Sequence, residues 1–123
     1  MGWIGVDLDG TLAEYKTEQK GKIGRPILGM TKRVKKWHQS GKDVRIFTAR
    51  AETEAGRKDV SSWLKSNGLP PFQVTNIKDS KMVELWDDKA IRVIKNSGNP
   101  CPSCKNAHKY SDSEIDPQFF TDC

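Results

Sequence analysis

The chain has 123 residues, of which 35% are hydrophobic and 30% charged. A chain of this length can bury one core but is too short for two ordinary domains. It contains no apolar run of about 20 residues, the length needed to cross a bilayer. A strand, and no signal peptide, is predicted from Trp3 onward, so we expect a cytoplasmic protein that does not enter membranes. The formal net charge of +5 favours anionic partners.

Predicted strands and helices alternate along the chain. The strands fall in apolar, β-branched runs, and the helices show an apolar stripe at helical spacing with Gly or Asn-Gly at the end. This alternation predicts a parallel sheet with right-handed crossovers and helices on both faces, an α/β fold of the three-layer, Rossmann-like type. The predicted strands span residues 3–8, 43–47, 73–77 and 82–86, and the predicted helices span 28–39 and 53–66.

Polar residues follow every predicted strand. Asp7-Leu8-Asp9-Gly10-Thr11 ends the first strand, Thr48 the second, Lys78 the third, and Asp87-Asp88 the fourth. Open α/β sheets bind their ligands beyond the carboxyl ends of the strands, so we expect these groups to meet at one edge of the sheet.

The first of these motifs carries two carboxylates and a glycine. Residues two apart on an extended backbone point the same way, so Asp7 and Asp9 are expected to face a common ligand. Gly10 permits a tight turn that a side chain would obstruct. A plain surface turn is the alternative, because Asp and Gly often end strands. The convergence of four strand ends favours a site.

The order of the motifs resembles the haloacid dehalogenase (HAD) superfamily of phosphotransferases. Its four motifs are Asp-x-Asp-Gly-Thr, a Thr or Ser, a Lys, and an acidic pair. Residues 44–50 and 86–90 look like the small phosphatase-like members found in bacteria and phages. The resemblance covers residues 3 to about 94, so we predict an HAD-like domain over 1–96 and a C-terminal tail over 97–123. It also implies the strand order 3-2-1-4-5, with the first strand at the centre.

The resemblance implies an Mg²⁺-dependent phosphatase that hydrolyses a phosphate monoester through an aspartyl-phosphate. Asp7 would be the nucleophile, while Asp9 would protonate the leaving oxygen and then activate water. Mg²⁺ prefers oxygen ligands, which Asp7, the backbone carbonyl of Asp9 and at least one of Asp87 and Asp88 would supply. The sequence does not decide between the two members of the acidic pair.

Thr48 and Lys78 would then stabilise the phosphoryl group through a hydroxyl and an ammonium. Each has a structural alternative, because Thr48 could cap the following helix and Lys78 could be a solvated loop lysine. Lys81 competes for the cationic role but sits at the start of the fourth strand, the wrong edge of the sheet. Gly10 and Arg50 are candidate substrate-binding residues.

No cap domain is predicted. Residues 13–28 are short and polar and are typical of a loop or small flap. The interval between Thr48 and Lys78 holds one helix. An open site of this kind could admit a nucleotide, a small phosphometabolite or a phosphorylated nucleic-acid end, or it could be closed by another subunit of an oligomer.

A basic run lies in the first predicted helix, at Lys32, Arg33, Lys35 and Lys36. Charge runs on amphipathic helices usually face water, and contact with nucleic acid is the alternative.

The tail contains a C-x-x-C motif. Cys101 and Cys104 could bind Zn²⁺, with His108 and Cys123 completing four ligands. The second pair lacks the spacing of a zinc ribbon, so reduced cytosolic thiols are the favoured interpretation, and a redox or disulfide role is the least favoured.

Two other functions stay open. The same fold could serve as a non-catalytic phosphate-binding or nucleic-acid-binding module, although a binder has no need of the two roles expected of Asp7 and Asp9. A phosphoacceptor receiver domain also combines acids, Thr and Lys on a parallel sheet. Its accepting Asp follows a later strand, however, so the order here fits poorly.

Overall fold

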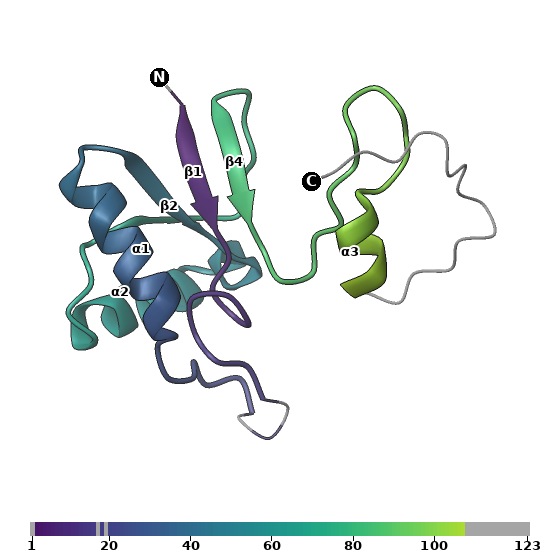
Figure 1. Ribbon diagram of the computed structural model, residues 1–123. Coiled ribbons are helices and arrows are strands. Elements are labelled where there is room, and N and C mark those ends of the chain that lie inside the picture. Colours follow the sequence, from purple (N-terminus) through teal and green to yellow (C-terminus); the bar gives the residue numbers. More distant parts are fainter. Residues whose placement is uncertain (1, 17, 19, 108–123) are drawn as a thin grey trace. The chain divides into compact units, whose positions relative to one another are not determined.

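The computed structural model describes residues 2–16, 18 and 20–107 and divides into two compact units, residues 1–88 and 89–123. The first unit is built on a parallel sheet of four strands, with α1 and α2 beside it (Figure 1). Its order is β3-β2-β1-β4, which confirms the predicted parallel α/β architecture and matches the first four places of the expected order. The strands are β1 (Trp3–Val6), β2 (Asp43–Phe47), β3 (Gln73–Thr75) and β4 (Met82–Trp86).

The core of the first unit lies on one face of this sheet. Ile4 and Val6 of β1 point to the same face as Val44 and Ile46 of β2, with which they are in register. These side chains form one hydrophobic cluster with apolar residues of both helices, α1 (Leu28–Gln39) and α2 (Glu54–Ser66). The residues contributed by the helices are Met30, Val34, Val60 and Leu64.

The opposite face of the sheet differs from the expectation of helices on both sides. Trp3 is buried there by Phe47, whose ring centroid lies 6.3 Å away, and by the guanidinium of Arg45 at 4.7 Å. Within the described part of residues 2–88, no helix covers this face, so a third layer is not seen in the first unit.

Connection length explains the difference. Two right-handed crossovers that step in the same direction, from β1 to β2 and on to β3, place both helices on one face. The connection that reverses direction runs from 76 to 81 and is too short for a helix. The fifth strand implied by the family resemblance is likewise absent from the sheet as far as the chain is described.

Local sequence sets the ends of the helices. Thr53 caps α2, because its hydroxyl accepts a hydrogen bond from the backbone N–H of Gly56 at 3.0 Å. Gly41 and Gly68 follow the ends of the two helices with φ of 82° and 68°, a conformation that glycine adopts without strain. No helix in the described residues is both long and apolar enough to cross a membrane.

The second unit is small. Val93 and Pro100 form an isolated antiparallel bridge, and α3 (Pro102–Ala107) follows it. Cys101 is fully buried, and its backbone N–H donates to the carbonyl of Arg92 at 2.7 Å. The compact units divide after Asp88, whereas the family resemblance places the boundary after residue 96.

Candidate metal and phosphate site

The register of β1 and β4 brings the first and last motifs together. Val6 is in register with Trp86, and the backbone N–H of Asp7 donates to the carbonyl of Trp86 at 2.8 Å. Both strands end there, so Asp7 and Asp87 leave the same edge of the sheet as neighbours. This is the carboxyl edge, where ligands of parallel sheets bind.

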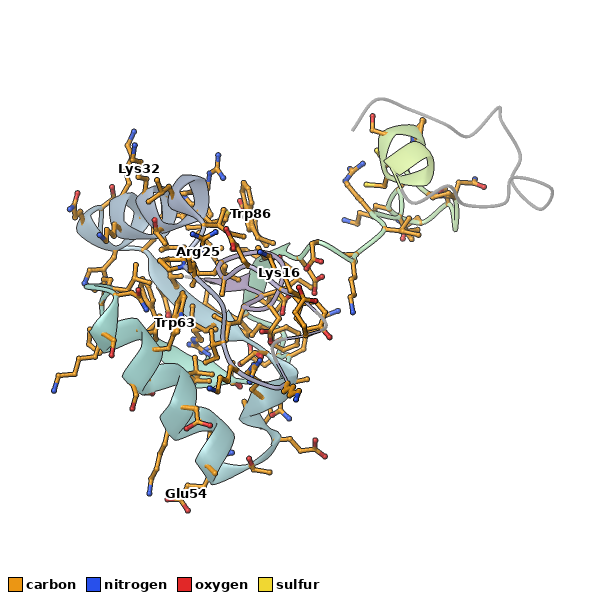
Figure 2. The ribbon with its side chains drawn as sticks, turned by 90° about the horizontal axis from the view of Figure 1, so that it is seen from below. Lys16, Arg25, Lys32, Glu54, Trp63 and Trp86 are labelled. Atoms are coloured by element: carbon orange, nitrogen blue, oxygen red, sulfur yellow. The ribbon has the colours of Figure 1, made fainter. Side chains whose placement is uncertain are left out.

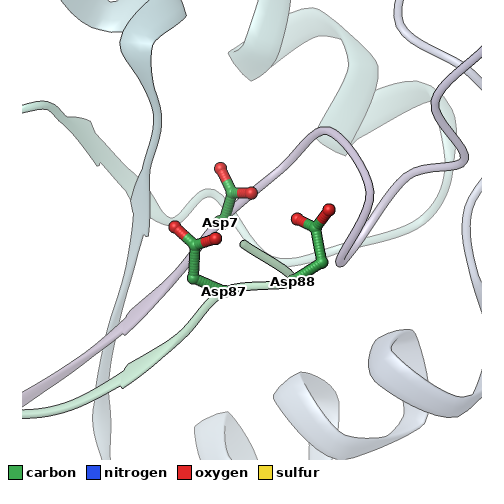
Figure 3. Close-up of side chains that lie close together, drawn as sticks. All are labelled: Asp7, Asp87 and Asp88. Atoms are coloured by element: carbon green, nitrogen blue, oxygen red, sulfur yellow. The ribbon is translucent and has the colours of Figure 1, made fainter. Parts of the chain in front are cut away.

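Three carboxylates converge at this edge. Asp7, Asp87 and Asp88 each offer an oxygen atom, and these atoms all lie within 4.8 Å of one another (Figure 3). Asp7 and Asp87 are half-buried and Asp88 is exposed. The sequence predicted this convergence, and three carboxylates at this separation can share one divalent cation.

Two residues of the first motif lie against Asp88: Thr11 binds it and Gly10 leaves room for it. The hydroxyl of Thr11 donates to Oδ1 of Asp88 at 3.0 Å and accepts from the backbone N–H of Asp88 at 3.0 Å. Sequence reasoning gave Thr11 no role, although its place in the Asp-x-Asp-Gly-Thr motif was the available signal. Gly10 has φ of 90°, and a Cβ there would lie 2.5 Å from Oδ2 of Asp88. The glycine is therefore required by the approach of Asp88 as well as by the turn.

We expect Gly10→Ala to weaken Mg²⁺ binding by about 10-fold or more, the usual effect of disturbing residues that orient a metal ligand. The added methyl group would collide with Asp88. Calorimetric titration with Mg²⁺ measures the affinity. Gly41→Ala is the matched control, since Gly41 also has a positive φ but has open space around its Cβ position. Equal affinities in the two variants would show that the close approach of Gly10 and Asp88 is unimportant.

Burial and like charge perturb Asp7. Desolvation, the negative charge of Asp87 and a hydrogen bond with the carboxyl of Asp88 raise the pKa of Asp7 to about 7. A backbone hydrogen bond from Leu8 opposes this rise, and the charge of Asp88 adds to it. Near neutral pH, ionised Asp7 is thus costly without a cation, so the cluster favours binding one.

The carboxylate of Asp9 pairs with Arg50 and is not one of the three that lie within 4.8 Å of one another. Its carboxylate accepts two hydrogen bonds from Arg50, 2.8 Å from Nε and 3.0 Å from a terminal guanidinium nitrogen. The other terminal nitrogen of Arg50 donates to the carbonyl of Gly21 at 2.6 Å. β1 ends at Val6, so the two-residue alternation of a strand does not extend to Asp9. Arg50 thereby ties the second acid to the flap.

Thr48 lies where it was predicted, buried directly after β2. Its backbone N–H donates to the carbonyl of Thr75 at 2.9 Å, and its hydroxyl accepts from the backbone N–H of Arg50 at 3.2 Å. The hydroxyl thus caps the 3-10 helix η2 (Ala49–Glu52), which was its structural alternative. Capping uses a lone pair of the oxygen and leaves its proton available to a phosphate.

Lys78 is not brought to the carboxylates by any contact. It is exposed, three residues beyond the end of β3, and forms no ion pair or hydrogen bond with the described residues. Its neighbour Asp79 instead accepts from the indole of Trp3 at 2.8 Å, next to the start of β1. Lys81 also lies at that end, because its carbonyl accepts from the backbone N–H of Trp3.

The flap after the first motif is a small loop and not a folded cap. Ala13 forms bridges with Asp9 and with Pro26, and the backbone N–H of Glu14 donates to the carbonyl of Arg25 at 2.8 Å. The indole of Trp63 in α2 donates to the carbonyl of Gly24 at 2.8 Å. In the described residues, the connection from β1 to β2 contains α1, and the connection from β2 to β3 contains η2 and α2. Within those residues, neither connection holds a folded cap.

The zinc hypothesis stays a prediction. Cys101 is buried and disulfide-bonded, which differs from the expected reduced thiol, and Cys104 is a half-buried free thiol. The other two proposed ligands, His108 and Cys123, lie outside the described residues.

Comparison with known proteins found no match: no family model, no curated protein and no solved structure is significantly similar to this chain.

Proposed function

We infer that the protein is an Mg²⁺-dependent phosphatase of the HAD type, which hydrolyses a phosphate monoester through a phosphorylated Asp7. The observation that carries this proposal is the convergence of Asp7, Asp87 and Asp88 at the carboxyl edge of a parallel sheet. The strand order and the position of Thr48 support it.

The residues at this edge fit a magnesium ion. Every donor of the triad is a carboxylate oxygen, and Mg²⁺ selects such ligands. Burial and the neighbouring charge of Asp87 raise the pKa of Asp7, and a cation would compensate the negative charge gathered there. When bound, Mg²⁺ would supply charge neutralisation between the phosphate and the carboxylates.

In the proposed reaction, an oxygen of Asp7 attacks the phosphorus and the ester P–O bond breaks. The leaving oxygen takes a proton from Asp9 and departs as an alcohol. Asp9 then takes a proton from water, whose oxygen attacks the phosphorus and breaks its bond to Asp7, so that phosphate is released and the Asp7 carboxylate is regenerated. Arg50 donates one hydrogen bond to each oxygen of Asp9, and each oxygen keeps a second lone pair that can take a proton. Thr48 would donate its hydroxyl to the phosphoryl oxygens.

The test is release of inorganic phosphate from p-nitrophenyl phosphate and from a panel of phosphorylated sugars, nucleotides and oligonucleotides. We expect turnover with Mg²⁺ and loss of turnover with EDTA, restored by added Mg²⁺. Turnover that is unaffected by EDTA would contradict the role of the triad. An absence of turnover on every substrate would contradict the enzyme.

One observation favours a second candidate, a phosphate-binding module without turnover. The Arg50–Asp9 pair engages the expected acid on both oxygens, at 2.8 and 3.0 Å, and Arg50 is further held by Gly21. If this pair holds Asp9 away from the leaving oxygen, the triad could bind Mg²⁺ and phosphate but not complete the reaction. Calorimetric binding of both ligands without phosphate release would identify this module.

A further inference from the structure

The exposed surface of α1 is strongly basic. Over Leu28–Gln39 the helix contains no Asp or Glu, and four cationic side chains on it are exposed. Lys42 follows the helix and is exposed as well. Lys32 points away from the body of the first unit (Figure 2). The four on the helix are Lys32, Arg33, Lys35 and Lys36.

These cations lack the acidic partners that Arg25, Arg45, Arg50 and Lys58 have. None of the five forms an ion pair with a carboxylate in the described residues, whereas Lys58 of α2 pairs with Glu54 at 3.4 Å. An ordinary solvated helix face mixes both signs of charge at spacings of three and four residues. A surface of one sign is instead suited to an anionic ligand.

A hollow runs along the exposed basic stripe of α1, which is formed by Lys32, Arg33 and Lys36 together with Lys42 after the helix. Its volume is about 530 Å³, and four cations line it without any carboxylate. Lys32 and Lys36 are one helical turn apart and Lys42 follows the helix, so an extended ligand with repeated anionic groups can contact several of these cations. The lining residues are Gly29, Lys32, Arg33, Lys36, Trp37, Ser40 and Lys42.

Aromatic contacts connect the stripe to the carboxylate triad. The guanidinium of Arg33 lies 4.9 Å from the ring centroid of Trp86, and Trp37 meets the same ring edge-on at 5.2 Å. Trp86 is the last residue of β4 and directly precedes Asp87. Arg33 of the basic surface therefore contacts the side chain of the residue that directly precedes Asp87.

We propose that this stripe, defined by Lys32, Arg33, Lys36 and Lys42, binds the sugar-phosphate backbone of a single-stranded nucleic acid whose phosphorylated end enters the Asp7-Asp87-Asp88 site. The proposal rests on the inferred phosphatase and names its substrate class. A small phosphometabolite would occupy the triad and leave four cations unused. A membrane surface fits less well, because α1 exposes one large hydrophobic side chain, Leu28.

A second hollow beside the flap is the competing location. It has a volume of about 430 Å³ and is lined by Lys20 and Lys22. It also contains the carboxylate of Asp59, and its third cation, Arg50, is already bound to Asp9 and Gly21. The net positive charge available to a ligand is smaller there than on α1.

The experiment measures binding of a fluorescent 5′- or 3′-phosphorylated oligothymidylate to the full chain by anisotropy, in EDTA so that no turnover occurs. We expect Lys32→Ala/Lys36→Ala to weaken binding by about 10-fold or more. It should also lower the slope of log affinity against log salt by ~1.4, because each single-strand phosphate contact contributes ~0.7. Lys58→Ala/Lys65→Ala on α2 makes the same charge change and should alter binding less than about 2-fold.

Three outcomes would overturn the proposal: no binding of the oligonucleotide, equal weakening by the α1 and α2 variants, or loss of binding in Lys20→Ala/Lys22→Ala with none in the α1 variant. Hydrolysis of p-nitrophenyl phosphate separates this proposal from the inferred phosphatase activity, and it should be equal in the wild type and in the α1 and α2 double variants. Hydrolysis without oligonucleotide binding would contradict only the proposed nucleic-acid-binding role of the stripe. Binding through the stripe without hydrolysis of any substrate defeats the phosphatase alone.

Discussion

Asp7→Asn is expected to lower kcat for phosphate ester hydrolysis by on the order of 10⁴-fold or more, the scale of losses seen when a nucleophile is removed. An amide oxygen is a poor nucleophile, and the other described carboxylates near Asp7 are held elsewhere. Asp87 and Asp88 both follow β4, and Asp9 is held by Arg50. The measurement is release of phosphate at saturating substrate and Mg²⁺.

The matched control is Asp43→Asn. This variant makes the same chemical change at the amino end of β2, the opposite end of the sheet from the site. The carboxylate of Asp43 pairs there with Arg45 at 2.9 Å. It should keep the wild-type rate within about 2-fold. If Asp7→Asn also kept that rate, Asp7 would not be the nucleophile.

The meeting of Asp7 with Asp87 and Asp88 could be predicted because strand ends of a parallel sheet share an edge whatever lies between them. Trp3–Val6 and Met82–Trp86 are recognisable as strands from local sequence alone, and their carboxyl ends carry the acids. The triad needed only the right sheet order in addition, which the family resemblance supplied.

The position of Asp9 could not be predicted in the same way. The expectation that it faces the ligand of Asp7 assumed an extended backbone to Leu8, but β1 ends at Val6. Its partner, Arg50, is 41 residues away in sequence, and no periodicity signals such a pairing. The same holds for the contact of Thr11 with Asp88.

Lys78 could not be placed from its position after the third predicted strand. The third strand stops at Thr75, where the hydroxyl of Thr75 accepts from the backbone N–H of Ile77 at 3.0 Å. The chain then has only residues 76–81 in which to return to the start of β4. Such a short connection cannot form a helix, which leaves Lys78 exposed and also leaves one face of the sheet without a helical layer.

The metal-free protein should lose stability as the pH rises from about 4 to 7, and Asp7 should be a main cause. The pKa of Asp7 is about 7 in the folded chain, against 3.8 for an ordinary aspartate. Between these values the folded state keeps a proton that the unfolded state has released, so raising the pH favours unfolding. At 1.36 kcal/mol per pKa unit, the loss is up to about 4 kcal/mol above pH 7.

Chemical denaturation in EDTA between pH 4 and pH 8 measures this effect. Asp7→Asn removes the titrating group, so its free energy of unfolding should fall less with pH and should exceed that of the wild type at pH 8, while Asp43→Asn follows the wild type. Added Mg²⁺ should reverse the order at pH 8, because only the wild type offers the full set of three carboxylates. If the free energies of unfolding of the wild type and Asp7→Asn changed in parallel with pH, the pKa of Asp7 would not be raised by its surroundings. Asp7 would thus lower the free energy of unfolding of the metal-free protein and also supply the nucleophile of the proposed reaction. Asp7→Asn is therefore expected to be inactive and, in the absence of metal, more stable than the wild type.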